Sequence, residues 1–164
     1  DSSTTPLVLD ADALNCVAKQ PEILLRKKAP VIITPHPGEM SRLTGLATPL
    51  VNAERERVAL DFAQKYGVVT VLKGAGTVIA SPNGKVLVNP TGNSGMATGG
   101  SGDVLAGMTA SILAQGASAF SSAAAAVYLH GLAGDIAAEK YGKISMLPTD
   151  LINCIPLAYK RCGF

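Results

Sequence analysis

The chain has 164 residues, of which 48% are hydrophobic and 16% are charged, and its formal net charge is +2. This length and composition predict one folded domain with a sizeable apolar core and exclude a largely disordered chain. The densest basic cluster, Arg26-Lys27-Lys28, is short and lacks interleaved aromatic residues, and no apolar run approaches the ~20 residues that cross a bilayer. We therefore expect neither a nucleic-acid partner nor a membrane.

Short apolar strands alternate with helices along the chain. We expect five strands, at Leu7–Leu9, Val31–Ile33, Val68–Leu72, Thr77–Ala80 and Lys85–Val88. The last two flank an Asn83-Gly84 pair, which is a hairpin signal. We expect helices at Asp12–Lys19, Pro37–Leu43 and Asn52–Tyr66, followed after Gly102 by a helical pattern that is broken near Gly116, Gly142 and Pro148.

This alternation indicates an α/β sandwich with a mainly parallel sheet. We interpret Asn52 as the N-cap of the third helix and Gly67 as its C-terminal stop. Ligands of such sheets bind beyond the carboxyl ends of the strands. Polar residues follow three of the predicted strands there, namely Asp10, Asp12, His36, Lys73 and Thr77.

The segment Gly92–Asp103, called the glycine loop below, is the most informative part of the sequence. It contains five glycines and runs directly into an apolar helical pattern. Such a loop aims free backbone N–H groups and the positive end of a helix dipole at one point, which suits a phosphate. Its spacing matches neither a Walker-type P-loop nor a Rossmann fingerprint. The alternative is an ordinary helix start that Ser101 caps and whose dipole favours Asp103.

Asp103 stands where an anion is expected to bind, and catalysis would explain a carboxylate there. It would act as a general base or would orient a hydroxyl group, while the loop amides neutralise charge on a phosphate. These two roles on one helical turn favour chemistry that resembles phosphoryl transfer.

Two further motifs point to the same edge of the sheet. Lys73-Gly-Ala-Gly-Thr77 combines a cation and a hydroxyl with glycines that permit close backbone approach, although glycine turns between strands are common. In Thr34-Pro-His-Pro-Gly-Glu39 two prolines fix the backbone around His36, so the imidazole is positioned for contact. The alternative is a simple turn with Glu39 in the first helical turn. One His and one Glu do not make a zinc site.

Other polar and sulfur residues fit structural roles. For His130 and Asp135 we favour packing and a local hydrogen bond. Cys16, Cys154 and Cys162 are odd in number and form no Cys-x-x-Cys pair, which favours reduced thiols in the cytoplasm, each as a small core residue.

Four segments together resemble the ADP/ATP-dependent NAD(P)H-hydrate dehydratases, members of the ribokinase-like superfamily once described as putative carbohydrate kinases. They are Leu9-Asp-Ala-Asp-Ala-Leu-Asn15, Thr34–Glu39, Lys73–Thr77 and Gly92–Asp103. The likeness continues in order to Met146-Leu-Pro-Thr-Asp-Leu151. It implies a ribokinase-like three-layer α/β/α sandwich that removes water from hydrated NADH or NADPH, using ADP or ATP and Mg²⁺, in a homo-oligomer.

The resemblance also assigns roles to residues. Asp103 would contact the hydrate and act in catalysis. The hydrate site would be lined by His36, Pro37, Gly38, Glu39, Met40, Ser41 and Arg42. The adenine nucleotide would be held by Lys73, Gly74, Ala75, Gly76 and Thr77, and by Asn93, Ser94, Gly95, Met96, Ala97, Thr98, Gly99, Gly100, Ser101 and Gly102. No side chain is assigned as a metal ligand.

Family members are longer before the Leu9–Asn15 segment, and this chain begins at Asp1 without methionine, close to an apolar strand. We therefore expect residues 1–164 to form the C-terminal part of a single ribokinase-like domain whose N-terminal strands are missing. Two alternatives remain open: a small-molecule kinase of the same superfamily, acting on a vitamin precursor or sugar, and a non-catalytic nucleotide-binding fragment.

Overall fold

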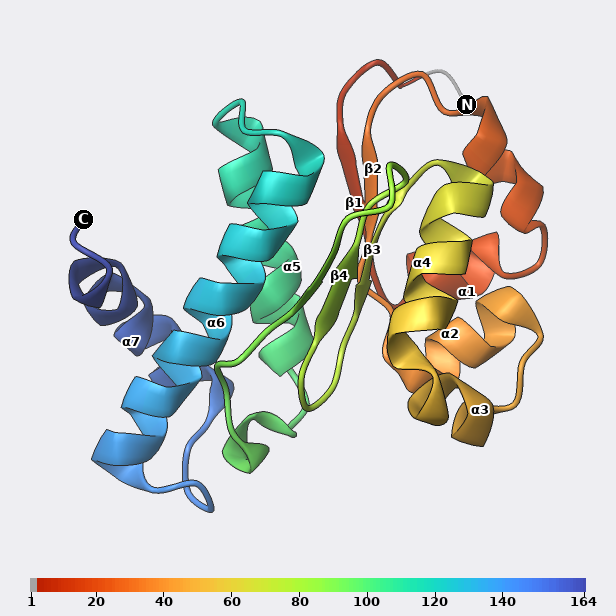
Figure 1. Cartoon of the computed structure of the whole chain (residues 1–164). Helices are drawn as coiled ribbons and strands as arrows, with labels where there is room; N and C mark the ends of the chain where they lie inside the picture. Colours follow the sequence, from red (N-terminus) through yellow and green to blue (C-terminus); the bar gives the residue numbers. More distant parts are fainter. Residues whose placement is uncertain (1–2) are drawn as a thin grey trace.

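The structure is a computed structural model that describes residues 3–164, and a five-stranded sheet forms its centre (Figure 1). The strands are β1 (Leu7–Leu9), β2 (Val31–Ile33), β3 (Val69–Leu72), β4 (Val78–Ala80) and β5 (Val86–Val88), and they lie in chain order across the sheet. β1, β2 and β3 pair in parallel, whereas β4 pairs antiparallel with both β3 and β5. Four of the five strands therefore point the same way, which confirms the mainly parallel sheet.

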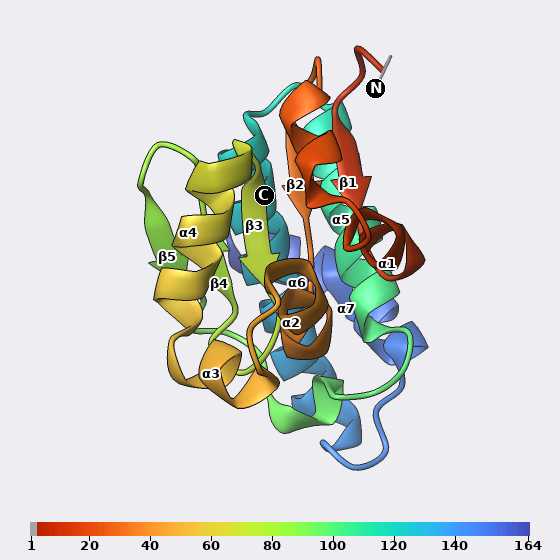
Figure 2. The ribbon, with the colours of Figure 1, turned by 90° about the vertical axis from the view of Figure 1, so that its right-hand side faces the viewer.

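Helices cover both faces of the sheet and complete a three-layer sandwich (Figures 1 and 2). The connections β1–β2 and β2–β3 step in one direction across the sheet, so right-handed crossovers put their helices on the same face. That face carries α1 (Asp12–Val17), the 3₁₀ turn η1 (Pro21–Arg26), α2 (Pro37–Thr44), α3 (Thr48–Ala53) and α4 (Arg55–Tyr66). The opposite face carries α5 (Ser101–Ala114) and α6 (Ala119–Tyr141), with α7 (Pro148–Arg161) packed on α6. A short 3₁₀ turn, η2 (Ser94–Met96), lies in the glycine loop.

The strands form the middle layer because they carry apolar side chains on both faces of the sheet. Ile32 and Val71 pack among residues of α5, α6 and α7, while their neighbours Ile33 and Leu72 pack among residues of α1 to α4. All four side chains are fully buried. Successive residues of a strand point to opposite faces, so a run of apolar residues suits a sheet that is covered on both sides.

The helix expected over Asn52–Tyr66 is two helices instead of one. Asn52 lies inside α3, and the backbone leaves the helical conformation at Glu54 (φ −126°) before α4 begins. Pro49 starts the earlier helix, because proline is favoured in a first helical turn. The N-cap role of Asn52 was therefore wrong, whereas Gly67 does end α4, in the left-handed conformation (φ 65°) that glycine adopts readily.

The three cysteines are free thiols in different surroundings. Cys154 is buried against the α5–α7 core, but Cys16 and Cys162 are exposed, so the expected core position was wrong for these two. Both sit near the ends of surface helices, where the apolar face of the helix points elsewhere. Within residues 3–164 no helix has the length and apolar character that crossing a membrane requires.

Candidate active site

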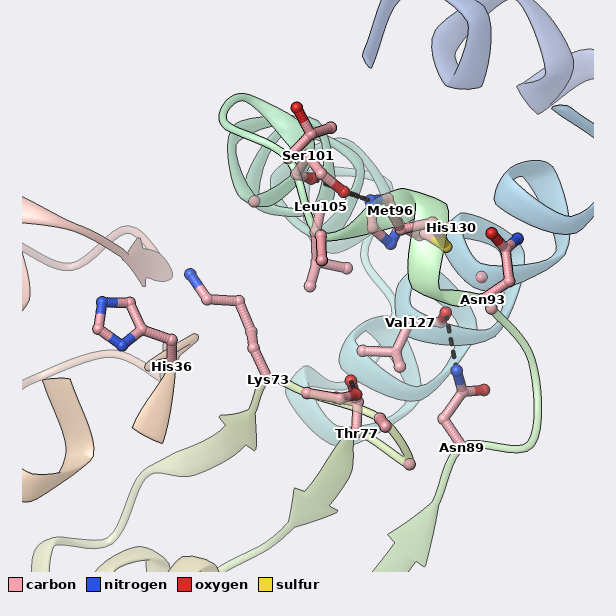
Figure 3. A pocket seen from close by; sticks show the side chains of 18 of the residues that line it. His36, Lys73, Thr77, Asn89, Asn93, Met96, Ser101, Leu105, Val127 and His130 are labelled. Carbon is pink, nitrogen blue, oxygen red and sulfur yellow. Dashed lines mark hydrogen bonds between the residues drawn. The ribbon is translucent and has the colours of Figure 1, made fainter. Parts of the chain in front are cut away.

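A cleft of about 960 Å³ opens beyond the carboxyl ends of β1, β2 and β3 (Figure 3). Because parallel strands end at one edge of the sheet, segments far apart in the sequence meet there. The cleft is lined by Asp10 after β1, His36 after β2, Lys73–Thr77 after β3 and most of the glycine loop. The three motifs that were predicted separately thus form one cavity.

Lys73 connects the three strand ends. Its Nζ lies 2.6 Å from Asp10 Oδ1 and 3.9 Å from Glu39 Oε2, and all three side chains are largely shielded from solvent. Its backbone N–H donates to Pro35 O at 2.8 Å, which fixes the end of β3 beside the end of β2. The base of the cleft therefore holds one cation between two carboxylates.

His36 occupies the N-cap of α2 with a defined orientation. Its ring Nδ1 accepts from the backbone N–H groups of Gly38 and Glu39 at 3.0 and 3.3 Å. The backbone N–H of His36 in turn donates to Glu39 Oε2 at 2.7 Å. This reciprocal pair is a capping box. Since Nδ1 accepts, the proton of the neutral ring resides on Nε2, which lies 3.5 Å from Glu39 Oε1 at the cleft. The capping interpretation is therefore confirmed, and contact of the oriented ring with a ligand stays a prediction.

Five of the residues assigned by resemblance do not line the cleft: Gly38, Met40, Ser41, Arg42 and Gly95. Helix α2 turns its side chains away after Glu39, so Met40 is fully buried in the α1–α4 core. Ser41 donates its hydroxyl to Leu46 O at 2.6 Å, away from the cavity, and Arg42 is exposed. The α2 contribution to the cleft is thus confined to its first turn.

The glycine loop leads into α5 without a capping side chain. The N-cap is Gly100 in the left-handed conformation (φ 95°), and Ser101 is already inside the helix and buried. The alternative of a Ser101 cap is therefore wrong, because the turn is formed by backbone that only glycine adopts readily. A helix start without a side-chain cap has first-turn N–H groups available to a ligand. Asp103 lies in this turn, is exposed and lines the cleft.

Gly102 shows how closely the glycine loop approaches the charged base. A Cβ on this residue would lie 3.3 Å from Lys73 Nζ and 3.8 Å from Asp10 Oδ2. The first turn of α5 is therefore directly beside the Lys73–Asp10 pair. The helix dipole, Lys73 and the Asp103 carboxylate act on the same small volume.

His130 on α6 is buried and hydrogen-bonded, which confirms the packing role favoured from the sequence, and it also lines the cleft. Its Nε2 lies 2.9 Å from Ser101 O and 3.4 Å from Ser101 Oγ (Figure 3). A nitrogen that faces a carbonyl oxygen has to donate, so the neutral ring carries its proton on Nε2. Burial, with a smaller contribution from the charge of Lys73, lowers the pKa of His130 to about 4, although the hydrogen bond to Ser101 O acts in the opposite direction.

Asp135, also on α6, holds the start of the glycine loop. Its Oδ2 accepts from Gly92 N at 2.9 Å and its Oδ1 accepts from Asn93 Nδ2 at 3.0 Å. The hydrogen bonds of His130 and Asp135 span 29 to 43 residues, so the expected local hydrogen bond was wrong. The signal available in the sequence was the pair Gly131 and Gly134 on the same helix, which indicates close approach of another segment.

Known proteins are similar to this chain in both fold and sequence. The bifunctional NAD(P)H-hydrate repair enzyme Nnr of Moorella thermoacetica is 47% identical over 156 residues, which are 95% of this chain and 29% of that protein. The crystal structure of ADP/ATP-dependent NAD(P)H-hydrate dehydratase from Bacillus subtilis, co-crystallised with ATP/Mg²⁺, matches with a TM-score of 0.89 at 37% identity. A ribokinase-like superfamily protein from Enterococcus faecalis matches with a TM-score of 0.76 at 32% identity. The fold is therefore ribokinase-like.

The chain is shorter than the proteins that it matches. It covers 56% of the Bacillus subtilis chain and 52% of the Enterococcus faecalis chain, while those structures cover 98% and 94% of it. The sequence model of a family described as NAD(P)H-hydrate dehydratase matches residues 2–157, nearly the entire chain and all segments of the cleft. On this match the chain belongs to the NAD(P)H-hydrate dehydratase family.

Proposed function

We propose that the intact protein removes water from hydrated NADH or NADPH in a reaction coupled to the cleavage of ADP or ATP. The observation that carries this proposal is the meeting of an uncapped helix start, a lysine and an exposed carboxylate in one cleft. Gly102 approaches Lys73 closely, and Asp103 follows it in the same turn of α5. Family membership and the similarity to a dehydratase crystallised with ATP/Mg²⁺ support the same reaction.

The proposed binding sites divide along the cleft. The nucleotide would lie against Lys73–Thr77 and the glycine loop, where backbone N–H groups and Lys73 stabilise phosphate charge. The hydrated nicotinamide would lie against the first turn of α2, at His36 and Glu39. The fully buried Met40 would support this turn from the α1–α4 core.

The chemistry explains why the two sites adjoin. Elimination breaks a carbon–oxygen bond to a hydroxyl group, and hydroxide is a poor leaving group. Phosphorylating or polarising this oxygen makes its departure feasible, which requires the nucleotide phosphates next to the hydrate. Asp103 stands at that junction, where an ionised carboxylate orients the hydroxyl or accepts its proton.

Magnesium would be held by Asp10 and Glu39 together with the nucleotide phosphates. Both carboxylates face Lys73 Nζ, which shows that this point favours a positive charge. Mg²⁺ is commonly held by one or two carboxylates and substrate phosphates rather than by a complete protein cage. Bound there, Mg²⁺ neutralises phosphate charge.

The Asp103→Asn variant tests the proposal in the intact protein. With hydrated NADH and ADP or ATP, the wild type should restore the absorbance of reduced nicotinamide. Asp103→Asn should lower kcat at least 100-fold while nucleotide binding is retained, because the amide neither accepts a proton nor carries charge. Asp61→Asn, which replaces an exposed carboxylate on α4, is the matched control and should leave kcat unchanged.

Two outcomes would contradict the proposal in different ways. If the wild type restores no absorbance but transfers phosphate to a hydroxylated acceptor, the protein is a small-molecule kinase. If it binds nucleotide and Asp103→Asn changes no rate because there is none, the protein is a non-catalytic nucleotide-binding module. The single-domain boundary at residues 1–164, the homo-oligomer and the cytoplasmic location stay predictions.

A further inference from the structure

One helix, α6, forms hydrogen bonds to both ends of the glycine loop. At one end His130 Nε2 donates to Ser101 O at 2.9 Å. At the other end Asn93 Nδ2 donates to Gly134 O at 3.0 Å, and Thr91, just before the loop, donates its hydroxyl to Tyr128 O at 2.9 Å. Two successive turns of α6, at residues 128–130 and 134–135, therefore hold the glycine loop and the residue before it.

Close approach is possible because α6 carries glycine where the loop packs. A Cβ at Gly131 would lie 2.8 Å from the backbone carbonyl carbon of Thr91, and one at Gly134 would lie 2.8 Å from Met96 Cγ. Both positions are too tight for any real Cβ. The two segments therefore fit only as helix backbone against loop.

Among these contacts, those of Asp135 have a charged acceptor, which makes a hydrogen bond stronger. Asp135 uses both carboxylate oxygens, one for Gly92 N at 2.9 Å and the other for Asn93 Nδ2 at 3.0 Å. Asn93 in turn accepts from Gly95 N through its Oδ1 at 3.0 Å. A single carboxylate thus holds Gly92 and Asn93 directly and Gly95 through Asn93, and Gly92 is in the left-handed conformation (φ 101°).

We propose that Asp135 is a positioning residue that preorganises the glycine loop for the adenine nucleotide. This inference rests on the proposed function, because it assigns that loop to the nucleotide. Asp135 is absent from the cleft lining, so it acts through Gly92 and Asn93 rather than by touching a ligand. A loop that is held before binding loses less conformational freedom when the ligand arrives, and affinity rises accordingly.

Asp135→Asn is the informative substitution, because asparagine has the same shape but only one acceptor oxygen. Its NH₂ group would face one of the two donors, so at least one hydrogen bond is lost. We expect the Kd for ADP with Mg²⁺ to rise about tenfold, which is the effect of losing one charge-assisted hydrogen bond of modest strength. With saturating nucleotide, kcat should stay within a factor of two, because the chemistry at Asp103 is untouched.

The experiment measures ADP binding by calorimetry and amide hydrogen exchange of the intact protein. Asp135→Asn should accelerate exchange at residues 92–96 and leave β3 unchanged. Glu139→Gln on the same helix is the matched control, because Glu139 is exposed and contacts Arg161 instead of the loop. It should change neither Kd nor exchange.

Several results would overturn the inference. They are an unchanged Kd, an unchanged exchange rate at residues 92–96, or acceleration throughout the sheet, which would mark Asp135 as a general structural residue. A wild type that binds no adenine nucleotide would also overturn it. If the intact protein binds ADP but has no dehydratase activity, the proposed function fails and the Kd and exchange data still decide the role of Asp135.

A second variant covers the case in which Asp135→Asn does not fold. Asp135→Glu keeps both acceptor oxygens but moves them by one methylene, so the loop is held in a shifted position. We expect the Kd for ADP to rise above the wild-type value, but by less than tenfold. A wild-type Kd would overturn the inference.

Discussion

Lys73 is the residue on which the cleft depends for charge balance. Its ammonium group lies between Asp10 and Glu39, and 19% of its side chain is exposed, compared with 12% and 7% for the two carboxylates. Removing one member of a shielded ion pair leaves the other charge poorly solvated, and this costs more than the pair itself contributes.

We therefore predict that Lys73→Met destabilises the protein and that a second change repairs part of the loss. Lys73→Met alone should lower the free energy of unfolding by about 1–3 kcal/mol. Adding Asp10→Asn should restore about half of this, because the nearer of the two uncompensated carboxylates is gone while Glu39 remains. Urea denaturation of both single variants and the double variant measures the coupling. Strictly additive losses would contradict the interpretation.

His130 should make stability depend on pH. Because its folded pKa of about 4 lies below the ordinary 6.5, its unfolded form binds more protons between these values. Its contribution is thus complete above pH 6.5 and is lost as pH falls toward 4, by up to about 3 kcal/mol.

The variant His130→Gln isolates this effect. Glutamine places a donor near Ser101 O but does not titrate, so its unfolding free energy should fall less steeply between pH 6.5 and 4 than that of the wild type. Thermal or urea unfolding at several pH values measures the two slopes. Equal slopes would show that other groups cause the pH dependence.

At the scale of elements, Gly131 and Gly134 of α6 leave space for the neighbouring loop, whereas Gly107 of α5 faces open space. Gly134→Ala should lower the free energy of unfolding by about 1–3 kcal/mol, because the new Cβ displaces Met96 and with it the loop. Gly107→Ala on α5 is the control, since a Cβ there meets nothing within 4 Å. It should raise stability by about 0.5–1 kcal/mol through helix propensity. Denaturant midpoints of the two variants should shift in opposite directions.

The elements that sequence reasoning located correctly are those with a local cause. The apolar runs of β1 to β3 and the Asn83-Gly84 turn between β4 and β5 lie where expected. The helix over Asn52–Tyr66 was placed correctly but not divided, because nothing in its periodicity marks the change of backbone at Glu54. Local pattern thus predicts that an element exists more readily than where it ends.

The residues of the cleft likewise separate into those that the local sequence predicts and those that only packing reveals. His36, Lys73 and Asp103 were predicted to meet because each follows a strand or opens a helix, and strand order brings such ends together. His130 and Asp135 were not included, because their partners lie 29 and 43 residues away and only packing of α6 on the loop reveals them. A helix interior gives no sign of what approaches it except its small residues.

At the scale of the whole molecule, the cleft joins both helical layers to the sheet. Asp10 and Lys73 follow strands, His36 opens a helix of one layer, and the glycine loop opens a helix of the other. A ligand that contacts all of them binds only the folded arrangement and therefore stabilises it.

We predict that ADP with Mg²⁺ raises the melting temperature of the intact protein. At a concentration 100 times its Kd, the free energy of unfolding should rise by about 2.7 kcal/mol. Adenosine, which has no phosphate for the helix start and Lys73, should stabilise the protein much less at equal concentration. Differential scanning fluorimetry compares the two ligands. Equal shifts would show that the phosphates do not bind in the cleft.

The distances along the chain that the cleft spans have a consequence for the order of folding. Lys73 and Asp10 are 63 residues apart, and Gly92 and Asp135 are 43 residues apart. Contacts between such distant residues form only after long segments have lost their freedom, so they come late. We therefore expect the hydrogen bonds that hold the glycine loop to form late in folding, once α6 has packed on the sheet. On the proposed function, a chain whose α6 has not yet left the ribosome would then be unable to bind nucleotide.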